Sequence, residues 1–273
     1  MRTRIDDFPD SQRLRATLEA VCGAPTAIRR ATEGGIANVW LIWTATGEWV
    51  VKVGSDCAVG EILQEASVLV RLRRWYGFVP ELMASGREGP AMAYVLLRAI
   101  PGRTLFSAWS GLPNDALYRT AKDLGRTLRW VHSWRPVKSG GRPWAERVFA
   151  RARSHIDGLY GTASAAIHRA RRLVLLRELD VVEGLVSADT ALGWIHGDVR
   201  LDNVVVGAQG VRGVIDWGRS AMGPVHYDVA AALNSVRVAG GDDLAQAVLI
   251  GYGAEGLDER LLQAYTRAWR VLR

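Results

Sequence analysis

The sequence of 273 residues predicts an α+β fold with two lobes: an N-terminal lobe of antiparallel strands with one key helix, and a larger, mostly helical C-terminal lobe. Short apolar segments rich in β-branched residues, separated by turn residues, recur up to Leu97. From Asn114 onwards, apolar residues recur at steps of three or four, which is helical spacing. We therefore expect residues 1–98 to form the N-terminal lobe and residues 99–273 the C-terminal lobe.

The N-terminal lobe is expected to begin with a short helix over Asp10–Cys22. Apolar, β-branched runs then predict strands over Thr26–Thr32, Val39–Thr44, Glu48–Val53, Leu82–Ala84 and Ala93–Leu97. Thr46 and Gly47 form a turn between the second and third of these strands. A helix is expected before the fourth, because four apolar residues form a stripe at helical spacing: Ile62, Ala66, Leu69 and Leu72.

The C-terminal lobe is expected to contain long helices over Asn114–Trp134, Trp144–Tyr160 and Ala165–Leu185. Two short apolar runs follow, Val204–Val206 and Val211–Ile215. Because the four residues between these runs begin and end with glycine, the pair is predicted to be a β-hairpin.

Three polar residues surround this hairpin: Asp198 on the preceding loop, Asn203 at its entry and Asp216 at its exit. Phosphoryl transfer from ATP uses one carboxylate to orient an attacking hydroxyl and accept its proton. It also uses an amide oxygen and a second carboxylate to hold Mg²⁺. Each residue alone is an ordinary loop former, but the set in this order predicts a phosphotransferase site with Asp198 as the base and Asn203 and Asp216 as metal ligands.

A lysine in an apolar strand supports this interpretation, since a buried ammonium needs a partner. Lys52 occupies the centre of Val50–Val53, and Glu65 lies beside the apolar stripe of the following helix. A strand lysine paired with a helix glutamate holds the phosphates of ATP in protein kinases. Glu61, one turn earlier on the same helix, is the alternative partner.

These motifs resemble those of the aminoglycoside phosphotransferase family, small-molecule kinases similar in fold to protein kinases. His196–Asn203 is similar to the catalytic loop of that family, and Ile215–Arg219 to its metal-binding segment, particularly in the 3'-phosphotransferase branch. Asp228 matches a structural aspartate that follows this segment. The resemblance extends from Thr26 to the C-terminus. It implies that residues 1–98 form a nucleotide-binding lobe and residues 99–273 a catalytic and substrate-binding lobe.

The resemblance implies roles for further residues. The carbonyl of Arg98 and the N–H of Ile100 would bind adenine, Gly34 and Gly35 would lie in the loop over the phosphates, and Arg219 would balance the acids of the catalytic loop. His196 would support the loop backbone, while Asp198 acts as the base. The implied cofactors are ATP (or GTP) and Mg²⁺, and the implied partner is a small-molecule hydroxyl substrate, expected to be an antibiotic.

Composition is consistent with a cytoplasmic enzyme that is a monomer or a homodimer. Two cysteines provide no disulfide framework, the N-terminus lacks the apolar core of a signal peptide, and no apolar run is long enough to span a membrane. The formal net charge is +7, but the arginine-rich helices lack the interleaved aromatic residues expected of a nucleic-acid-binding protein. We therefore expect no nucleic-acid partner and no membrane partner.

The acceptor is less closely defined by the sequence. Arginines cluster before the catalytic loop, at Arg169, Arg171 and Arg172, in the region where enzymes acting on polycationic aminoglycosides often carry acids. The acidic residues left to contact such a substrate are Asp180, Glu183 and Asp189 before the catalytic loop, Asp202 within it, and Asp242, Asp243, Glu255, Asp258 and Glu259 near the C-terminus. This pattern favours an acceptor with few positive charges. The alternatives are a metabolic kinase of the same fold, acting on a sugar, homoserine or choline, and a non-catalytic nucleotide-binding module.

Overall fold

The computed structural model describes residues 8–9, 11–31, 37–75, 77–134, 144–160, 166–188 and 191–272. The chain forms two compact units. The N-terminal unit comprises Met1–Arg103 together with Val205–Gly207 and Arg212–Arg219, and the C-terminal unit comprises the remainder. No helix within the described ranges is both long enough and apolar enough to cross a bilayer.

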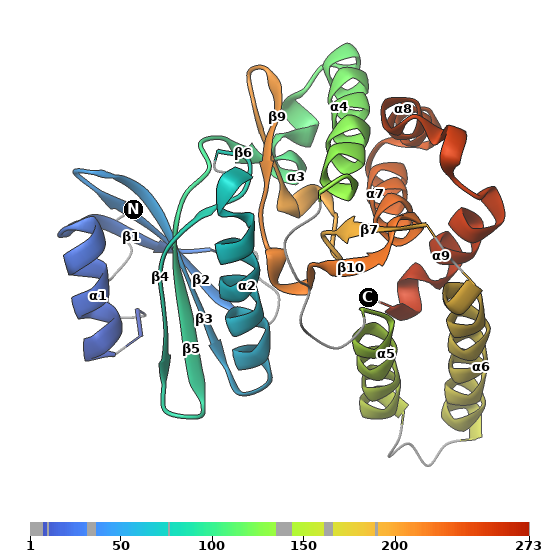
Figure 1. Ribbon diagram of the computed structural model, residues 1–273, viewed down its shortest axis with the longest axis horizontal. Helices are drawn as coiled ribbons and strands as arrows, with labels where there is room; N and C mark the ends of the chain where they lie inside the picture. The colour runs from blue at the N-terminus through green and yellow to red at the C-terminus, as the bar shows by residue number, and fades with distance from the viewer. Residues whose placement is uncertain are drawn as a thin grey trace. The chain divides into compact units, whose positions relative to one another are not determined.

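An antiparallel sheet is the centre of the N-terminal unit (Figure 1). Its strands lie in the order β1-β2-β3-β5-β4, with bounds β1 Pro25–Arg30, β2 Asn38–Thr44, β3 Gly47–Ser55, β4 Glu81–Glu88 and β5 Met92–Arg98. The predicted strands are therefore present, with β4 extending beyond the short run that the sequence indicated. The predicted first strand ends at Arg30, and Thr32 lies outside the described residues.

Two helices cover opposite faces of this sheet (Figure 1). α1 (Gln12–Cys22) begins at Ser11, whose hydroxyl accepts a hydrogen bond from the Leu14 N–H at 2.9 Å. Leu14 and Leu18 of α1 share a buried cluster with Trp40, Trp49, Val51 and other side chains on one face of the sheet. α2 (Val59–Leu72) packs on β3 and β5 instead. Because side chains alternate along a strand, Lys52 lies on the face opposite Val51, towards α2.

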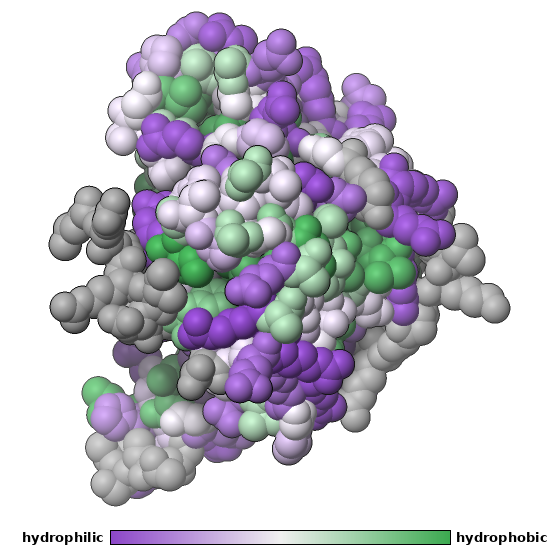
Figure 2. Space-filling view, turned by 90° about the vertical axis from the view of Figure 1, so that its left-hand side faces the viewer, coloured by the Kyte–Doolittle hydropathy of each residue, from purple (hydrophilic) through white to green (hydrophobic). Residues whose placement is uncertain are grey.

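The surface over α1 mixes hydrophobic and hydrophilic residues. Figure 2 views the molecule from the side on which α1 lies, and its hydrophobic residues form several separate areas among hydrophilic ones. The apolar residues of the N-terminal unit are therefore concentrated inside, between the sheet and its two helices, with Ile42, Val51, Val95 and Leu96 fully buried.

The C-terminal unit is mostly helical, as predicted. Its helices are α3 Leu105–Ala108, α4 Asn114–His132, α5 Trp144–Tyr160, α6 Ala166–Ala188, α7 Val225–Gly240, α8 Asp242–Tyr252 and α9 Glu259–Leu272. The apolar stripe predicted for α4 is buried, from Leu117 to Val131. α4 and α8 approach closely, since a side chain on Gly125 or Gly251 would collide with the backbone of the other helix.

Short strands frame the loops that carry the polar motif. β7 (Leu192–Ile195) pairs antiparallel with β10 (Ala221–Pro224). β6 (Arg103–Thr104), β8 (Val204–Gly207) and β9 (Gly210–Val214) form a second small sheet. The predicted hairpin is present, with a two-residue loop between β8 and β9. The assignment of nucleotide binding and catalysis to separate lobes remains a prediction.

Candidate active site

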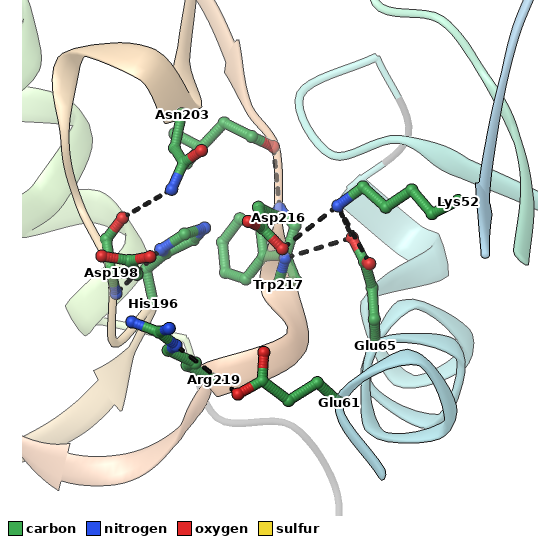
Figure 3. Close-up of polar contacts among 10 residues, drawn as sticks. Lys52, Glu61, Glu65, His196, Asp198, Asn203, Asp216, Trp217 and Arg219 are labelled. Carbon is green, nitrogen blue, oxygen red and sulfur yellow. Dashed lines mark hydrogen bonds and ion pairs between the residues drawn. The ribbon is translucent and has the colours of Figure 1, made fainter. Parts of the chain in front are cut away.

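A buried lysine is the centre of the polar cluster in the N-terminal unit. Lys52 Nζ lies 2.9 Å and 3.0 Å from the two carboxylate oxygens of Glu65, and 3.1 Å from Oδ1 of Asp216 (Figure 3). Lys52 and Glu65 are both buried. β3 therefore supplies a cation, α2 supplies its fixed counter-ion, and the segment after β9 supplies a second carboxylate.

The two carboxylates keep Lys52 charged. Burial alone would lower the pKa of the Lys52 ammonium, but the negative charges of Asp216 and Glu65 outweigh burial and hold this pKa above its ordinary value. A lysine in this setting is a permanent positive charge at neutral pH. It can attract anionic oxygen atoms that reach the same place.

Glu65, and not Glu61, is the partner of Lys52. The carboxylate of Glu61 is half-exposed and lies 3.9 Å from Nε of Arg219 (Figure 3). Glu65 also accepts a hydrogen bond from the Trp217 N–H at 3.3 Å. α2 therefore contacts the segment after β9 through both glutamates, but only Glu65 reaches the lysine.

This pairing predicts a large loss of stability for Glu65→Gln, because the substitution leaves a buried ammonium with one carboxylate in place of two. We expect the free energy of unfolding to fall by about 3 kcal/mol. The matched variant Glu61→Gln removes a half-exposed charge, so its effect should stay below about 1 kcal/mol. Denaturant unfolding of both proteins measures the difference. Equal losses in the two variants would contradict the buried pair.

The backbone of Asp216 has an uncommon conformation. Its φ is 69°, in the left-handed region that residues other than glycine seldom adopt. Trp217, the next residue, is fully buried, and its indole N–H donates to the Val214 carbonyl at 2.7 Å. These contacts fix the turn, so the Asp216 carboxylate is half-exposed while one of its oxygens contacts Lys52. Such backbone strain is concentrated at functional sites.

The loop after β7 is held by a buried carboxylate in the C-terminal unit. Asp228, on α7, accepts hydrogen bonds from the N–H groups of His196 and Gly197 at 2.6 Å and 2.8 Å. The ring Nδ1 of His196 accepts from the Asp198 N–H at 3.2 Å. Both contacts agree with the supporting roles that the family resemblance implies for His196 and Asp228.

Asn203 ties the end of this loop to its start. Its side-chain amide donates to the carbonyl of Asp198 at 2.9 Å (Figure 3), and its N–H donates to the Arg200 carbonyl at 2.9 Å. Because the NH₂ group is used as a donor, the amide oxygen is the atom of Asn203 suited to a cation. The amide oxygen of Asn203 and the carboxylate of Asp216 are each a hard oxygen ligand of the kind that Mg²⁺ prefers.

Arg200 is a polar residue of the site that the sequence interpretation missed. Its Nε lies 3.1 Å from Oδ1 of Asp198, and its Nη1 lies 3.7 Å from Oδ2 of Asp202. Arg200 has an extended backbone, with φ −128° and ψ 163°. In extended chain, residues two apart project to the same side, so its spacing from Asp198 was the available signal.

The structure does not test the predicted roles of the remaining site residues. Gly34 and Gly35 lie outside the described residues. Arg98 ends β5, where its side chain pairs with Glu81 at 3.0 Å and lies over the Trp49 ring. The roles of the Arg98 carbonyl and the Ile100 N–H in adenine binding remain predictions, as does a catalytic role for Arg219.

Comparison with known proteins agrees with these motifs. The family model of the phosphotransferase enzyme family (APH) matches residues 27–268. An aminoglycoside 3'-phosphotransferase of Niallia circulans is 34% identical over 95 residues. This match covers 34% of this chain and 34% of the relative, so the chain spans about a third of the length of that relative.

Solved structures extend the similarity over nearly the whole chain. A crystal structure of an aminoglycoside-3'-phosphotransferase of type VIII is 25% identical, with a TM-score of 0.73, and the match covers 96% of this chain and 98% of that one. The aminoglycoside phosphotransferase APH(3'')-Id of Streptomyces rimosus has the same fold, with a TM-score of 0.74 at 21% identity over 97% of this chain and 99% of that one. The resemblance identified in the sequence is confirmed: this chain belongs to the phosphotransferase enzyme family.

Proposed function

We propose that the protein is an ATP-dependent O-phosphotransferase that transfers the γ-phosphoryl group to a hydroxyl of a small molecule. The observation that carries this proposal is the buried Lys52 ammonium held between Glu65 and the half-exposed Asp216. A fixed cation beside a carboxylate suited to a metal ion is the arrangement that kinases use to position nucleotide phosphates.

Each predicted residue has a part in this function. Lys52 binds phosphate oxygens of the nucleotide, and Glu65 orients Lys52. Asn203 and Asp216 would hold Mg²⁺, which supplies neutralisation of the phosphate charge when bound. Further nucleotide contacts are assigned to the backbone of Gly34, Gly35, Arg98 and Ile100, and Arg219 is assigned to balancing the acids of the catalytic loop.

Asp198 handles the acceptor. Its carboxylate accepts a hydrogen bond from the substrate hydroxyl and receives the proton as the hydroxyl oxygen bonds to the γ-phosphorus. The bond between that phosphorus and the oxygen bridging to the β-phosphate breaks, and ADP leaves with this oxygen. The Arg200 guanidinium, 3.1 Å from the Asp198 carboxylate, lies close to the oxygen that attacks and favours the negative charge developing there.

An antibiotic is the proposed acceptor, because the Niallia circulans relative and the type VIII structure are both aminoglycoside 3'-phosphotransferases. The charges on α5 and α6 favour a weakly cationic one. Arg153 of α5 pairs with both Asp180 and Glu183, and Arg172 pairs with Asp157. Two of the acids available to bind a polycation, Asp180 and Glu183, are therefore already paired with arginine.

A panel of acceptors tests the substrate class. We expect transfer of the γ-phosphoryl group to an antibiotic hydroxyl, with ATP as the donor and GTP as a second donor. At fixed ionic strength, kcat/KM should be higher for weakly charged hydroxylated antibiotics than for kanamycin. Each close pair of like charges costs about 1 kcal/mol in water at ~4 Å. Faster turnover of homoserine, choline or a simple sugar would instead establish a metabolic kinase. A clear preference for kanamycin would contradict the charge argument, and nucleotide binding without any transfer would contradict the enzyme itself.

A further inference from the structure

α6 has an exposed apolar face on the side away from its packing contacts. Its buried residues, Leu179, Val182 and Val186, face α5 and α9, and Figure 1 shows α6 running beside α5 in a helical hairpin. On the remaining surface, the exposed fraction is 74% for Ile167, 52% for Val174, 64% for Val181 and 36% for Leu185. More large apolar side chains are exposed on α6 than on any other helix in the described part of the chain.

These four residues lie on a single stripe, whereas Leu173, the fifth large apolar side chain exposed on α6, lies outside it. At the helical rotation of about 100° per residue, the stripe occupies a sector about 100° wide. We call it the α6 stripe, and it consists of Ile167, Ala170, Val174, Arg177, Glu178, Val181 and Leu185. Every member is exposed. The stripe is apolar towards both ends and charged at its centre, where Arg177 and Glu178 lie.

The α6 stripe is complementary to itself when reversed. If a second α6 runs antiparallel about the midpoint between residues 177 and 178, Val174 lies opposite the partner's Val181. Ala170 then lies opposite the partner's Leu185, so that a small side chain meets a large one. At the centre, Arg177 lies opposite the partner's Glu178, and the two-fold axis repeats every pair.

The central charges select this arrangement. Arg177 and Glu178 form no ion pair with any other residue in the ranges that the structure describes. A shift of one heptad would place Arg177 opposite Arg171 of the other copy, and a parallel arrangement would place Arg177 opposite itself. Only the antiparallel register centred between residues 177 and 178 pairs opposite charges and keeps the apolar positions matched.

We propose that the α6 stripe is the interface of a homodimer in which two α6 helices pack antiparallel about a two-fold axis. The occupant of this face is a second copy of the same chain, because the pattern of size and charge is complementary to its own reverse. α6 contains 23 residues and is ~34 Å long at 1.5 Å per residue, which gives the contact several helical turns.

Charge reversal with restoration tests the proposal by sedimentation velocity over a range of protein concentrations. The wild-type chain should be a dimer. Arg177→Glu places a glutamate opposite Glu178 of the other copy, and Glu178→Arg places an arginine opposite Arg177 of the other copy. Because the two-fold axis repeats this repulsion, each variant should raise the dimer Kd at least about tenfold. The double variant R177E/E178R restores opposite charges and should return the Kd to within about threefold of wild type.

The control is Arg169→Glu, at an exposed position on the same helix that lies outside the α6 stripe. This variant should leave the dimer Kd unchanged. Circular dichroism checks that each variant stays helical. If one single variant fails to fold, the other provides the same repulsion. A monomeric wild-type chain would overturn the proposal. So would a dimer that either reversal leaves intact, or one that the double variant does not restore, since each outcome would place the contact elsewhere or in another register.

Discussion

Replacing Asp198 by asparagine is expected to lower kcat by about 10²–10⁴-fold while the affinity for ATP stays nearly unchanged. Asparagine keeps the size of the side chain but cannot accept a proton from the acceptor hydroxyl. The loop should keep its shape, because its backbone is held by Asp228 and Asn203, and neither contact uses the Asp198 side chain. Steady-state kinetics and nucleotide titration on the same protein measure both quantities.

Asp202→Asn is the matched control for this variant. Asp202 lies on the same loop and also faces Arg200, with Nη1 at 3.7 Å, but its side chain is more exposed than that of Asp198. We expect its kcat to remain within about threefold of wild type, since exposed ion pairs contribute little. Activity of Asp198→Asn close to that of wild type, or an equal loss in both variants, would remove Asp198 from the role of base.

The second large effect is expected at Asp216. Asp216→Asn should lower kcat by at least about 10²–10³-fold and weaken the dependence of nucleotide binding on Mg²⁺, because the charge of a hard oxygen ligand is lost. Asparagine is a better test than alanine. Residue 216 has a φ of 69°, which asparagine tolerates and which would strain alanine.

Two variants complete this test. Asp56, like Asp216, is a described non-glycine residue with a positive φ, at 50°. Asp56→Asn therefore controls for the effect of asparagine on such a backbone and should leave kcat unchanged. Asn203→Ala removes a neutral ligand and should be milder than Asp216→Asn. Calorimetric titration of the nucleotide with and without Mg²⁺ separates binding from turnover. A more damaging effect of Asn203→Ala would mean that the roles of the two ligands are assigned wrongly.

The sequence predicted the fold because its patterns are regular. The apolar run that identified β3 also marked Lys52 as a buried cation in need of a partner, and the stripe that predicted α2 placed Glu65 beside its apolar face. The sequence did not decide between Glu61 and Glu65, because residues four apart share a helix face and differ mainly by ~6 Å along the axis. Only the packed position of α2 decides which carboxylate reaches the ammonium.

Loops and outward helix faces were harder to predict. Arg200 was missed because its two-residue spacing from Asp198 is informative only if the backbone between them is extended, and the sequence of a loop does not reveal this. The left-handed backbone of Asp216 depends on the contacts of Trp217. For α6, apolar residues surround much of the helix, so the sequence alone does not separate the face that packs on α5 from the α6 stripe. The structure distinguishes them by burial.

Transfer of labelled phosphate tests the central claim most directly. The protein is incubated with Mg²⁺, ATP carrying ¹⁸O at the non-bridging oxygens of the γ-phosphate, and an acceptor antibiotic, and the acceptor is analysed by mass spectrometry. The proposed reaction predicts that the acceptor gains one phosphoryl group with all three labelled oxygens, that ADP is released, and that Asp198→Asn nearly abolishes the product. An adenylylated acceptor, or labelled inorganic phosphate with every acceptor unmodified, would contradict the proposed phosphotransferase.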